Sequence, residues 1–243
     1  MGNNTTVLEC SNRTRPPHGR VARHRSVFTA DTFWSMAAAD ADLTAMARIR
    51  NAALELLSRR GFAATSIRDV AAEAGVSAGL VQHYFPTKVA LREAVDDHVI
   101  ALVTDTFGDT LAASRDKDVL VDLGDRVTQF VKAHGSAMRY VARGLADSEE
   151  SALALFDIFI DVATAQWRQL DEDGVLRQDA DLVWASLHVV MLNFATVLFE
   201  DAVSRHLPRP FFDDREIERW NRVTTEFFRS GLLNQSGGRG RRT

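Results

Sequence analysis

Residues 65–88 read TSIRDVAAEAGVSAGLVQHYFPTK, and the architecture of the chain can be worked out from this segment. Gly75 lies between two short runs of helical periodicity and accepts the left-handed backbone conformation that a tight turn requires. Thr65 is expected to cap the first run and Ser77 the second, because a side-chain oxygen there accepts a hydrogen bond from an otherwise unpaired backbone amide. The spacing therefore predicts a helix-turn-helix.

Helical periodicity continues on both sides of this segment. One helix is expected to end before Gly61, and another, at 87–107, is expected to follow Pro86. No stretch alternates between apolar and polar residues as a half-buried strand does. Further helices are expected at 118–134, 136–147, 149–173, 180–206 and 213–233. The predicted fold is all-α, with about nine helices: an N-terminal three-helix head that contains the helix-turn-helix, on a larger helical body.

Charge and composition divide the chain further. Residues 1–95 carry 12 Lys and Arg against 8 Asp and Glu, whereas residues 96–243 carry 17 against 25. A basic front on an acidic remainder is typical of a nucleic-acid-binding head joined to a body with another task. The expected segments are a flexible arm at 1–43, the helix-turn-helix domain at 44–95, the helical body at 96–235 and a disordered tail at 236–243.

Several protein classes are excluded by what the sequence lacks. Cys10 is the lone cysteine, which rules out a disulfide framework or a cysteine-based zinc cluster and fits a reducing cytoplasm. No signal peptide is recognisable, and a cytoplasmic protein is expected. The uncharged run 182–199 is diluted by polar residues and flanked by acidic ones, so we interpret it as a core helix rather than a membrane span. Hydrolase, metalloprotease and phosphate-loop motifs are absent, so we expect no enzyme, no cofactor and no metal.

The helix-turn-helix segment also carries a specific motif. From Gly61 onward it reads Gly-Phe-x-x-Thr-Ser-Ile-Arg-Asp-Val-Ala-x-x-Ala-Gly-Val-Ser-x-Gly, followed by His-Tyr-Phe-x-Thr-Lys up to Lys88. This pattern resembles the DNA-binding domain of the TetR family of bacterial transcriptional regulators, and the resemblance covers about residues 44–95. It implies a homodimer on palindromic double-stranded operator DNA, usually a repressor, whose body binds a small-molecule effector.

The resemblance also implies roles for single residues. Residues 77–85 would form the recognition helix in the major groove, with Gln82 pairing with adenine and Ala78 touching a thymine methyl group. Thr65 would bind a phosphate at a helix N-terminus, and Lys88 would contact the DNA backbone. The implied DNA-binding residues are Thr65, Ser66, Arg68, Ser77, Ala78, Gly79, Gln82, His83, Tyr84 and Lys88.

Three of these residues have a structural alternative. Tyr84 could mainly pack rather than contact a phosphate, and His83 could cap or pack. Arg68 could be a solvated surface charge. The arginines of the arm at 1–43 could reach a minor groove or belong to a disordered segment.

The body mixes aromatic residues with scattered polar ones, as small-molecule pockets do. An ordinary hydrophobic core, however, has aromatic residues at the same helical spacing. Asp157 and Asp161 would favour a positively charged ligand, or else form a solvated face. With His134 or His188 they could also bind a divalent cation, but acidic residues four apart are more often a solvated face. The candidate ligand-binding residues are Met138, Phe156, Asp157, Phe159, Trp167, Trp184, His188 and Met191.

Two helices of the body are candidates for a dimer interface. The helix expected at 180–206 is apolar on nearly every side, so one face needs a partner besides its own core. Together with the helix at 213–233, it would form a four-helix interface between two subunits. Effector binding would be transmitted to the head through the helix at 87–107. The alternative is a DNA-binding regulator without an effector, which a body without a cavity would favour.

Overall fold

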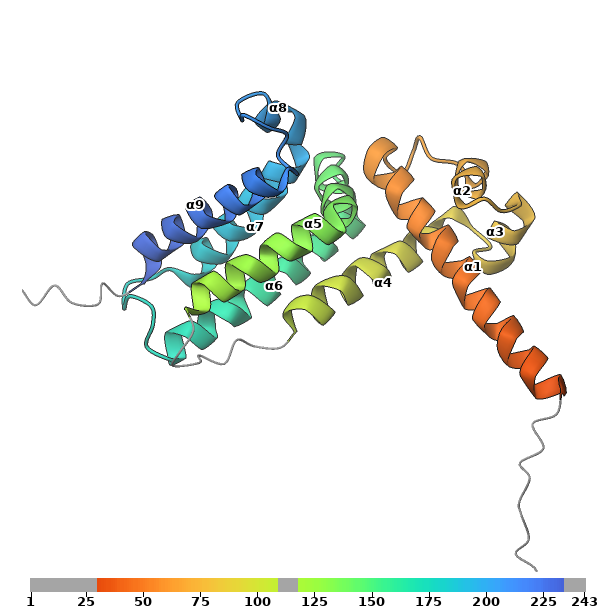
Figure 1. Ribbon diagram of the computed structural model, residues 1–243, viewed down its shortest axis with the longest axis horizontal. Helices are drawn as coiled ribbons and strands as arrows, with labels where there is room; N and C mark the ends of the chain where they lie inside the picture. Colours follow the sequence, from red (N-terminus) through yellow and green to blue (C-terminus); the bar gives the residue numbers. More distant parts are fainter. Residues whose placement is uncertain (1–29, 109–117, 234–243) are drawn as a thin grey trace, which may run out of the picture. The chain divides into compact units, whose positions relative to one another are not determined.

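The computed structural model describes residues 30–108 and 118–233, with side chains described from Thr44 onward. Within these ranges the chain forms nine helices and no strand, so the all-α prediction is confirmed (Figure 1). The helices are α1 (Ala30–Arg60), α2 (Ile67–Ala74), α3 (Ala78–Tyr84), α4 (Lys88–Phe107), α5 (Val119–Ala146), α6 (Glu150–Glu172), α7 (Leu182–Leu198), α8 (Glu200–Ser204) and α9 (Asp214–Leu232).

Two compact units divide the chain, Met1–Ala41 and Asp42–Thr243, and the contacts described below belong to the second. Helix α1 begins at Ala30, inside the segment expected to be a flexible arm. Residues 30–43 are rich in alanine, which favours a helix even without apolar periodicity. The rest of the expected arm, 1–29, and the expected tail at 236–243 lie outside the described residues.

The apolar core of the head is continuous with that of the body. In the head, its buried side chains come from α1, α2, α3 with the residue after it, and the first half of α4, at helical spacing. The core residues are Ile49, Ala53, Leu57, Val70, Ala71, Val81, Phe85, Leu91 and Val95. Because Val81 and Phe85 both belong to this core, the orientation of α3 is fixed and its opposite face is left for solvent or a partner.

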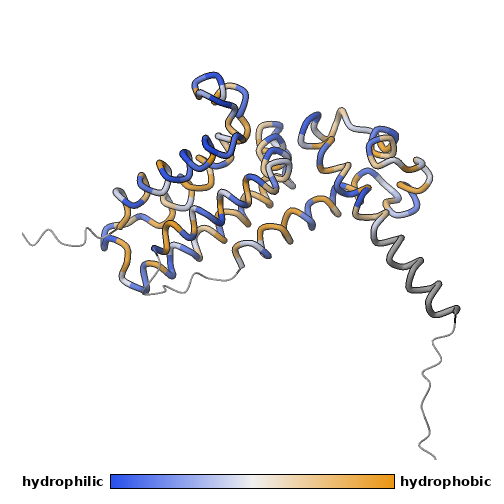
Figure 2. The backbone as a smooth tube through the Cα atoms, in the orientation of Figure 1, coloured by the Kyte–Doolittle hydropathy of each residue, from blue (hydrophilic) through white to orange (hydrophobic). Residues whose placement is uncertain are grey.

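The body is a bundle in which α5, α6, α7 and α9 lie alongside one another (Figure 1). Figure 2 shows hydrophobic and hydrophilic residues alternating along α5 and α9, as expected for helices with one face in a core. Helix α4 begins in the head and packs against α5 and α6, so it belongs to both parts. None of the described helices combines the length and the apolar character needed to cross a membrane.

Two helix boundaries in the body differ from the prediction. The helices expected at 118–134 and 136–147 form the single helix α5, with a kink at His134 (φ −129°, ψ 31°) rather than a break at Gly135. The helix expected at 180–206 divides into α7 and α8 at Phe199. Both positions depend on packing, which local periodicity does not encode.

Candidate DNA-binding surface and ligand cavity

The turn between α2 and α3 has the geometry that the sequence predicts. Gly75 adopts the left-handed conformation (φ 66°, ψ 38°) and ends α2. Ser77 caps α3, because its Oγ accepts a hydrogen bond from the Leu80 amide at 3.1 Å. Thr87 caps α4 in the same way, with the Ala90 amide at 3.0 Å. The predictions for this turn and for the start of α4 are confirmed.

The cap of α2 is Ser66, so the prediction that Thr65 caps this helix is wrong. The Asp69 amide donates to Ser66 Oγ at 3.2 Å, and the Ser66 amide donates to Asp69 Oδ2 at 2.9 Å, which together form a capping box. The Thr65 side chain is only 3% exposed, and its hydroxyl donates to the Gly61 carbonyl at 2.8 Å. Thr65 therefore stabilises the turn from inside, and its hydroxyl proton is already used in the bond to Gly61.

Helix α3 presents polar and small side chains on its outer face. Gln82 and His83 are exposed, whereas Tyr84 is half-buried and packs edge-on against the His83 ring at 5.3 Å between centroids. Ser77 and Gly79 are exposed as well, and Ala78 is half-buried. Gly79, Gln82 and His83 therefore lie on the exposed side of α3, whereas Ala78 and Tyr84 also pack against the core.

Lys88 and Arg92, one turn apart at the start of α4, flank one aromatic ring. The Lys88 ammonium lies 4.2 Å and the Arg92 guanidinium 4.5 Å from the centroid of Phe62. A cation over a ring face is attracted to the electrons of the ring, which restricts the directions in which both side chains point. Phe62 thus holds Lys88 at the edge of the helix-turn-helix.

The basic residues of the head differ in how far their charge is neutralised. Arg59 pairs with Glu55 at 3.2 Å and with Glu73 at 3.3 Å. By contrast, Arg68 is exposed and forms no ion pair with the described residues, so its positive charge faces solvent. Of these two arginines, Arg68 is the better suited to a phosphate.

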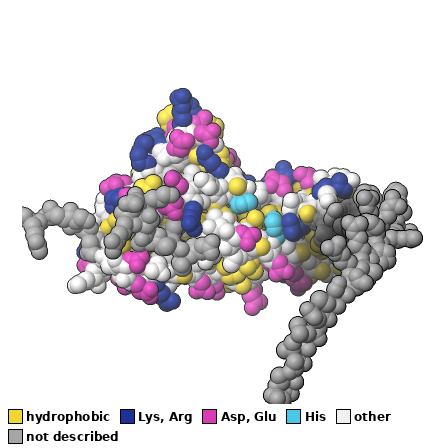
Figure 3. Space-filling model, turned by 60° about the horizontal axis from the view of Figure 1, so that its bottom comes forward, with side chains coloured by type: hydrophobic (Ala, Val, Ile, Leu, Met, Phe, Trp, Pro, Cys, Tyr) yellow, Lys and Arg dark blue, Asp and Glu magenta, His cyan; other side chains and the backbone are white. Residues whose placement is uncertain are grey.

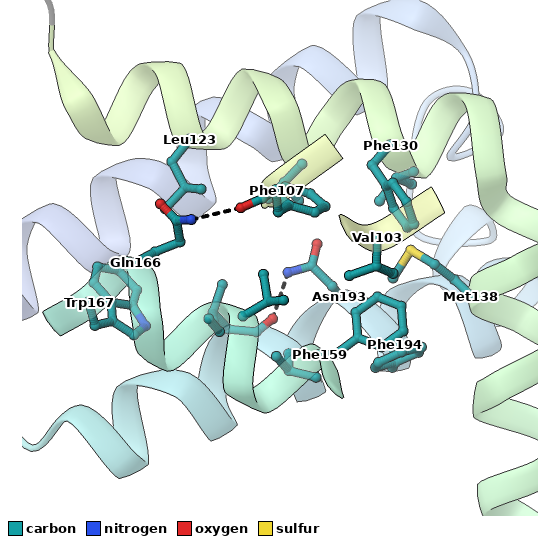
Figure 4. Close-up of a pocket in the computed structure, with 16 residues that line it drawn as sticks. Val103, Phe107, Leu123, Phe130, Met138, Phe159, Gln166, Trp167, Asn193 and Phe194 are labelled. Carbon is teal, nitrogen blue, oxygen red and sulfur yellow. Dashed lines mark hydrogen bonds between the residues drawn. The ribbon is translucent and has the colours of Figure 1, made fainter. Parts of the chain in front are cut away.

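A cavity lies inside the body, between α4, α5, α6 and α7 (Figure 4). Its volume is about 80 Å³. Figure 4 shows Phe130, Met138, Phe159 and Phe194 at one end and Gln166 and Trp167 at the other, with Asn193 between them.

Three of the eight predicted ligand-binding residues, Met138, Phe159 and Trp167, line this cavity. Phe156 packs behind it against Phe194, at 6.0 Å between ring centroids. Asp157 is exposed, as is Asp161, so neither carboxylate can attract a cation into the cavity. The remaining three, Trp184, His188 and Met191, lie on the exposed side of α7.

The candidate ligand-binding residues do not include the polar residues of the cavity, Gln166 and Asn193, although both stand among the polar residues scattered along these helices. A buried polar residue in an otherwise apolar helix is the signal that would have found Asn193. Gln166 Nε2 donates to the Phe107 carbonyl at 3.0 Å and so ties α6 to the end of α4. Val103 and Phe107 also line the cavity, which places the end of α4 in its wall.

Partly buried polar contacts join the head to the body. Tyr140 of α5 donates to Asp96 of α4 at 2.6 Å, and Ser136 of α5 donates to Glu55 of α1. Burial raises the pKa of the Asp96 carboxyl, although the hydrogen bond from Tyr140 opposes this shift. The pKa of Tyr140 is raised by burial first and by its bond to Asp96 second. These contacts follow the kink at His134, so the second half of α5 touches both the cavity, through Met138, and the head.

Helices α7 and α9 expose large apolar side chains. Trp184 is 56% exposed and Phe227 is 66% exposed, and both line a groove between the two helices. Other exposed apolar residues on these helices are Val183, Met191, Leu192, Leu198 and Val223. On the face shown in Figure 3, acidic and basic side chains are interspersed with apolar ones.

Comparison with known proteins relates the head to one family. A family model described as bacterial regulatory proteins of the tetR family matches residues 49–95. The HTH-type transcriptional regulatory protein RaaS of Mycobacterium tuberculosis is 36% identical over 123 residues, which are 51% of this chain and 55% of that protein. An HTH-type transcriptional repressor of the same organism is 53% identical over 53 residues, which are 22% of this chain and 28% of the repressor. The chain thus spans about half or less of these curated relatives.

The similarity of fold extends further than the similarity of sequence. A TetR transcriptional regulator from Chloroflexus aurantiacus superposes with a TM-score of 0.58 at 18% identity, over 80% of this chain and 98% of that one. The fold of the body therefore matches as well as that of the head. Residues 49–95 thus match the DNA-binding domain of the tetR family of bacterial regulatory proteins, and the fold of the chain is similar to that of a TetR regulator.

Proposed function

We propose that this protein is a transcriptional repressor that binds a palindromic operator as a homodimer and releases it when a small, mostly apolar molecule binds in the body. The observation that carries this proposal is the outer face of α3, where Gln82 and His83 are exposed beside a capped turn and opposite the buried side chains of Val81 and Phe85. A seven-residue helix fixed in this way can enter a major groove with its side chains toward the base edges.

The residues of this face divide into two kinds. Gln82 can pair with adenine through its amide, and Ala78 can contact a thymine methyl group, so these two would read sequence. Arg68 and Lys88 are cations at the edges and would bind phosphates, which fixes the register of the protein on DNA. The proposed contact residues are Ser66, Arg68, Ser77, Ala78, Gly79, Gln82, His83, Tyr84 and Lys88.

Dimerisation through α7 and α9 is supported by their exposed apolar side chains. A surface with Trp184, Met191 and Phe227 uncovered is costly in water, and a second copy presenting the same surface would bury it. Two-fold symmetry would place two α3 helices on the same side of the dimer, as a palindrome requires.

Effector binding is supported by the cavity, which favours it over the alternative of a regulator without a ligand. Helix α4 begins at Lys88 beside the DNA-binding surface and ends at Phe107 in the cavity wall. A ligand that moves the end of α4 would therefore alter the spacing of the two recognition helices.

Selection of binding sites from random DNA by the full chain tests the DNA-binding part. We expect a palindrome whose half-sites are centred roughly 34–36 Å apart, about one turn of the double helix. A single asymmetric site bound by one subunit would overturn the proposal.

A further inference from the structure

The polar residues in the cavity wall use their amide donors within the protein. Gln166 Nε2 donates to the Phe107 carbonyl at 3.0 Å, and Asn193 Nδ2 donates to the Val189 carbonyl at 2.6 Å. The Oδ1 atom of Asn193 and the Nε1 atom of Trp167 are almost wholly covered by neighbouring atoms. Apart from Gln166 and Asn193, the residues that line the cavity are apolar, so the surface offered to an occupant is apolar.

This surface sets the chemistry of an occupant. None of the sixteen described residues that line the cavity is acidic or basic, and the carboxylates of Asp157 and Asp161 are exposed to solvent. A charged or hydrogen-bonding group placed in the cavity would lose its bonds to water without replacing them. Apolar groups gain free energy from the same burial. The wall therefore favours a neutral occupant whose buried part carries no hydrogen-bonding group.

The cavity is small for such an occupant. Its volume is about 80 Å³, whereas an engineered apolar cavity of about 150 Å³ in another protein takes up benzene or xenon. A xenon atom is smaller than a benzene ring, so it can enter with the least displacement of the wall. A molecule that contains a benzene ring requires part of the wall to move.

Phe107 is the part of the wall that can move most readily. It is the last residue of α4, its ring lies 5.4 Å from that of Phe130 between centroids, and its carbonyl accepts the hydrogen bond from Gln166 of α6 (Figure 4). The last carbonyls of a helix have no partner within it, so Gln166 supplies the missing bond. Because helices fray at their ends, Phe107 is displaced more easily than Phe130 in the middle of α5.

We propose that the effector is a neutral molecule recognised by its apolar volume, and that it acts by displacing Phe107 and breaking the hydrogen bond from Gln166. This inference rests on the effector function proposed above. Breaking the bond releases the end of α4 from α6. Since α4 begins at Lys88 beside the DNA-binding surface, Gln166 is a positioning residue that favours the DNA-binding conformation.

Three probes of similar size and shape test the chemistry of the occupant: ethylbenzene, benzyl alcohol and benzylamine. They differ in a terminal methyl, hydroxyl or ammonium group, and calorimetric titration of the full chain gives a Kd for each. We expect ethylbenzene to bind roughly 5-fold or more tightly than benzyl alcohol, because the hydroxyl loses its hydrogen bonds to water, and benzylamine to bind least. Benzyl alcohol or benzylamine binding as tightly as ethylbenzene would overturn the proposal.

Gln166→Met tests the positioning role, because it removes the hydrogen bond and keeps an unbranched side chain of similar length. We expect the ratio of ethylbenzene affinity to operator affinity to rise roughly 2- to 12-fold, since one hydrogen bond is lost from the DNA-binding conformation alone. General damage to the fold would lower both affinities and leave their ratio unchanged. Gln169→Met makes the same change on α6, where the glutamine donates to Asp173, and should leave the ratio unchanged. An equal ratio in wild type and Gln166→Met would overturn the proposal.

Xenon tests whether the volume of the occupant matters. We expect xenon under pressure to shift its own NMR signal on binding and to leave operator affinity unchanged, because it enters without displacing Phe107. Ethylbenzene should weaken operator binding roughly 5-fold or more. Xenon that releases operator DNA as strongly as ethylbenzene would contradict the role given to volume.

The outcomes also separate this inference from the proposed function. If benzyl alcohol or benzylamine is the tightest binder and releases operator DNA, the effector function stands and this inference fails. If ethylbenzene releases operator DNA equally well from wild type and Gln166→Met, with an unchanged ratio, the effector function again stands without the role of Gln166. If none of the probes binds, the cavity is not a ligand site for molecules of this size and both proposals fail.

Discussion

Gln82 and Lys88 lie on one surface of the head, yet their substitutions should differ in kind. Gln82 is exposed on α3 and carries both a donor and an acceptor, so it can distinguish one base from another. We expect Gln82→Ala to relax the preference at one base pair of each half-site, at a cost of about 1–3 kcal/mol. Site selection with wild type and variant measures this, and an unchanged preference at every position would refute the assignment.

The Lys88 side chain carries a positive charge but lacks the combination of donor and acceptor that distinguishes one base from another. Lys88→Ala should weaken binding to all DNA sequences alike and lower the slope of log affinity against log salt by about one unit. Titrations at several salt concentrations, on operator and on unrelated DNA, measure both effects. Arg59→Ala is the control, because this arginine is already paired with Glu55 and Glu73. A salt slope that stays the same in Lys88→Ala would mean that Lys88 only packs on Phe62.

Asp96 makes the junction of head and body sensitive to pH. Its pKa is raised by burial, so the folded state holds the proton more tightly than the unfolded one, and stability falls as the pH rises through the raised pKa, above 3.8. Tyr140 opposes this by donating to the carboxylate. We therefore expect Tyr140→Phe to lower the free energy of unfolding by more at pH 7 than at pH values below the pKa of Asp96.

The pH dependence of the Tyr140→Phe effect needs its own control. Denaturant titrations at several pH values, repeated in an Asp96→Asn background, isolate the pair from other carboxyl groups. In that background the cost of Tyr140→Phe should no longer change with pH. If it still does, the pH dependence belongs to other groups.

Among the secondary-structure elements, the turn between α2 and α3 should lose stability when Gly75 is replaced by alanine. At Gly75 (φ +66°) an added Cβ meets no atom within 4 Å, so Gly75→Ala changes the backbone energy alone. We expect a loss of about 1–2 kcal/mol, the cost of a left-handed alanine. Gly231 in α9 is equally uncrowded but helical, so Gly231→Ala should not destabilise, and equal effects of the two in chemical denaturation would contradict the argument.

For these elements, some features could be predicted from the sequence and others could not. Gly75, Ser77 and Thr87 were predictable because turns and caps depend on residues close in the chain. Ser66 rather than Thr65 as the cap was within reach, since Ser66 and Asp69 form the capping box. The exposed side of α3 followed directly from this local order.

The body was predictable only as a set of helices. Local periodicity did not place the kink at His134 rather than Gly135, nor the break at Phe199. Periodicity likewise could not assign Trp184 to the surface, because α7 is apolar on nearly every side, nor show that Trp167 of α6 lines a cavity rather than ordinary core. Which apolar face meets a core, a ligand or a second chain is decided by tertiary packing.

For the whole molecule, the exposed face of α7 and α9 makes dimerisation testable. We expect Phe227→Glu to convert the protein to monomers in sedimentation, because a charge would be buried against apolar partners. Leu153→Glu, on the exposed side of α6, is the matched control. Monomers should bind a full palindrome roughly 100-fold more weakly or worse, while keeping their affinity for a half-site. A Phe227→Glu protein that remains dimeric would place the interface elsewhere.

Effector release, finally, requires the two sites to influence each other equally. A ligand can displace DNA only if it binds the DNA-free conformation more tightly, and DNA must then weaken the ligand by the same factor. Helix α4, with Lys88 at the DNA-binding surface and Phe107 at the cavity, is the element through which we expect this coupling. A factor of 5 to 150 corresponds to about 1–3 kcal/mol. Titrating ethylbenzene into free protein and into the operator complex, then operator into protein with and without ethylbenzene, measures the factor twice. Equal factors above one would establish the coupling, whereas a ligand affinity unaffected by DNA would mean that the cavity is occupied without regulating the head.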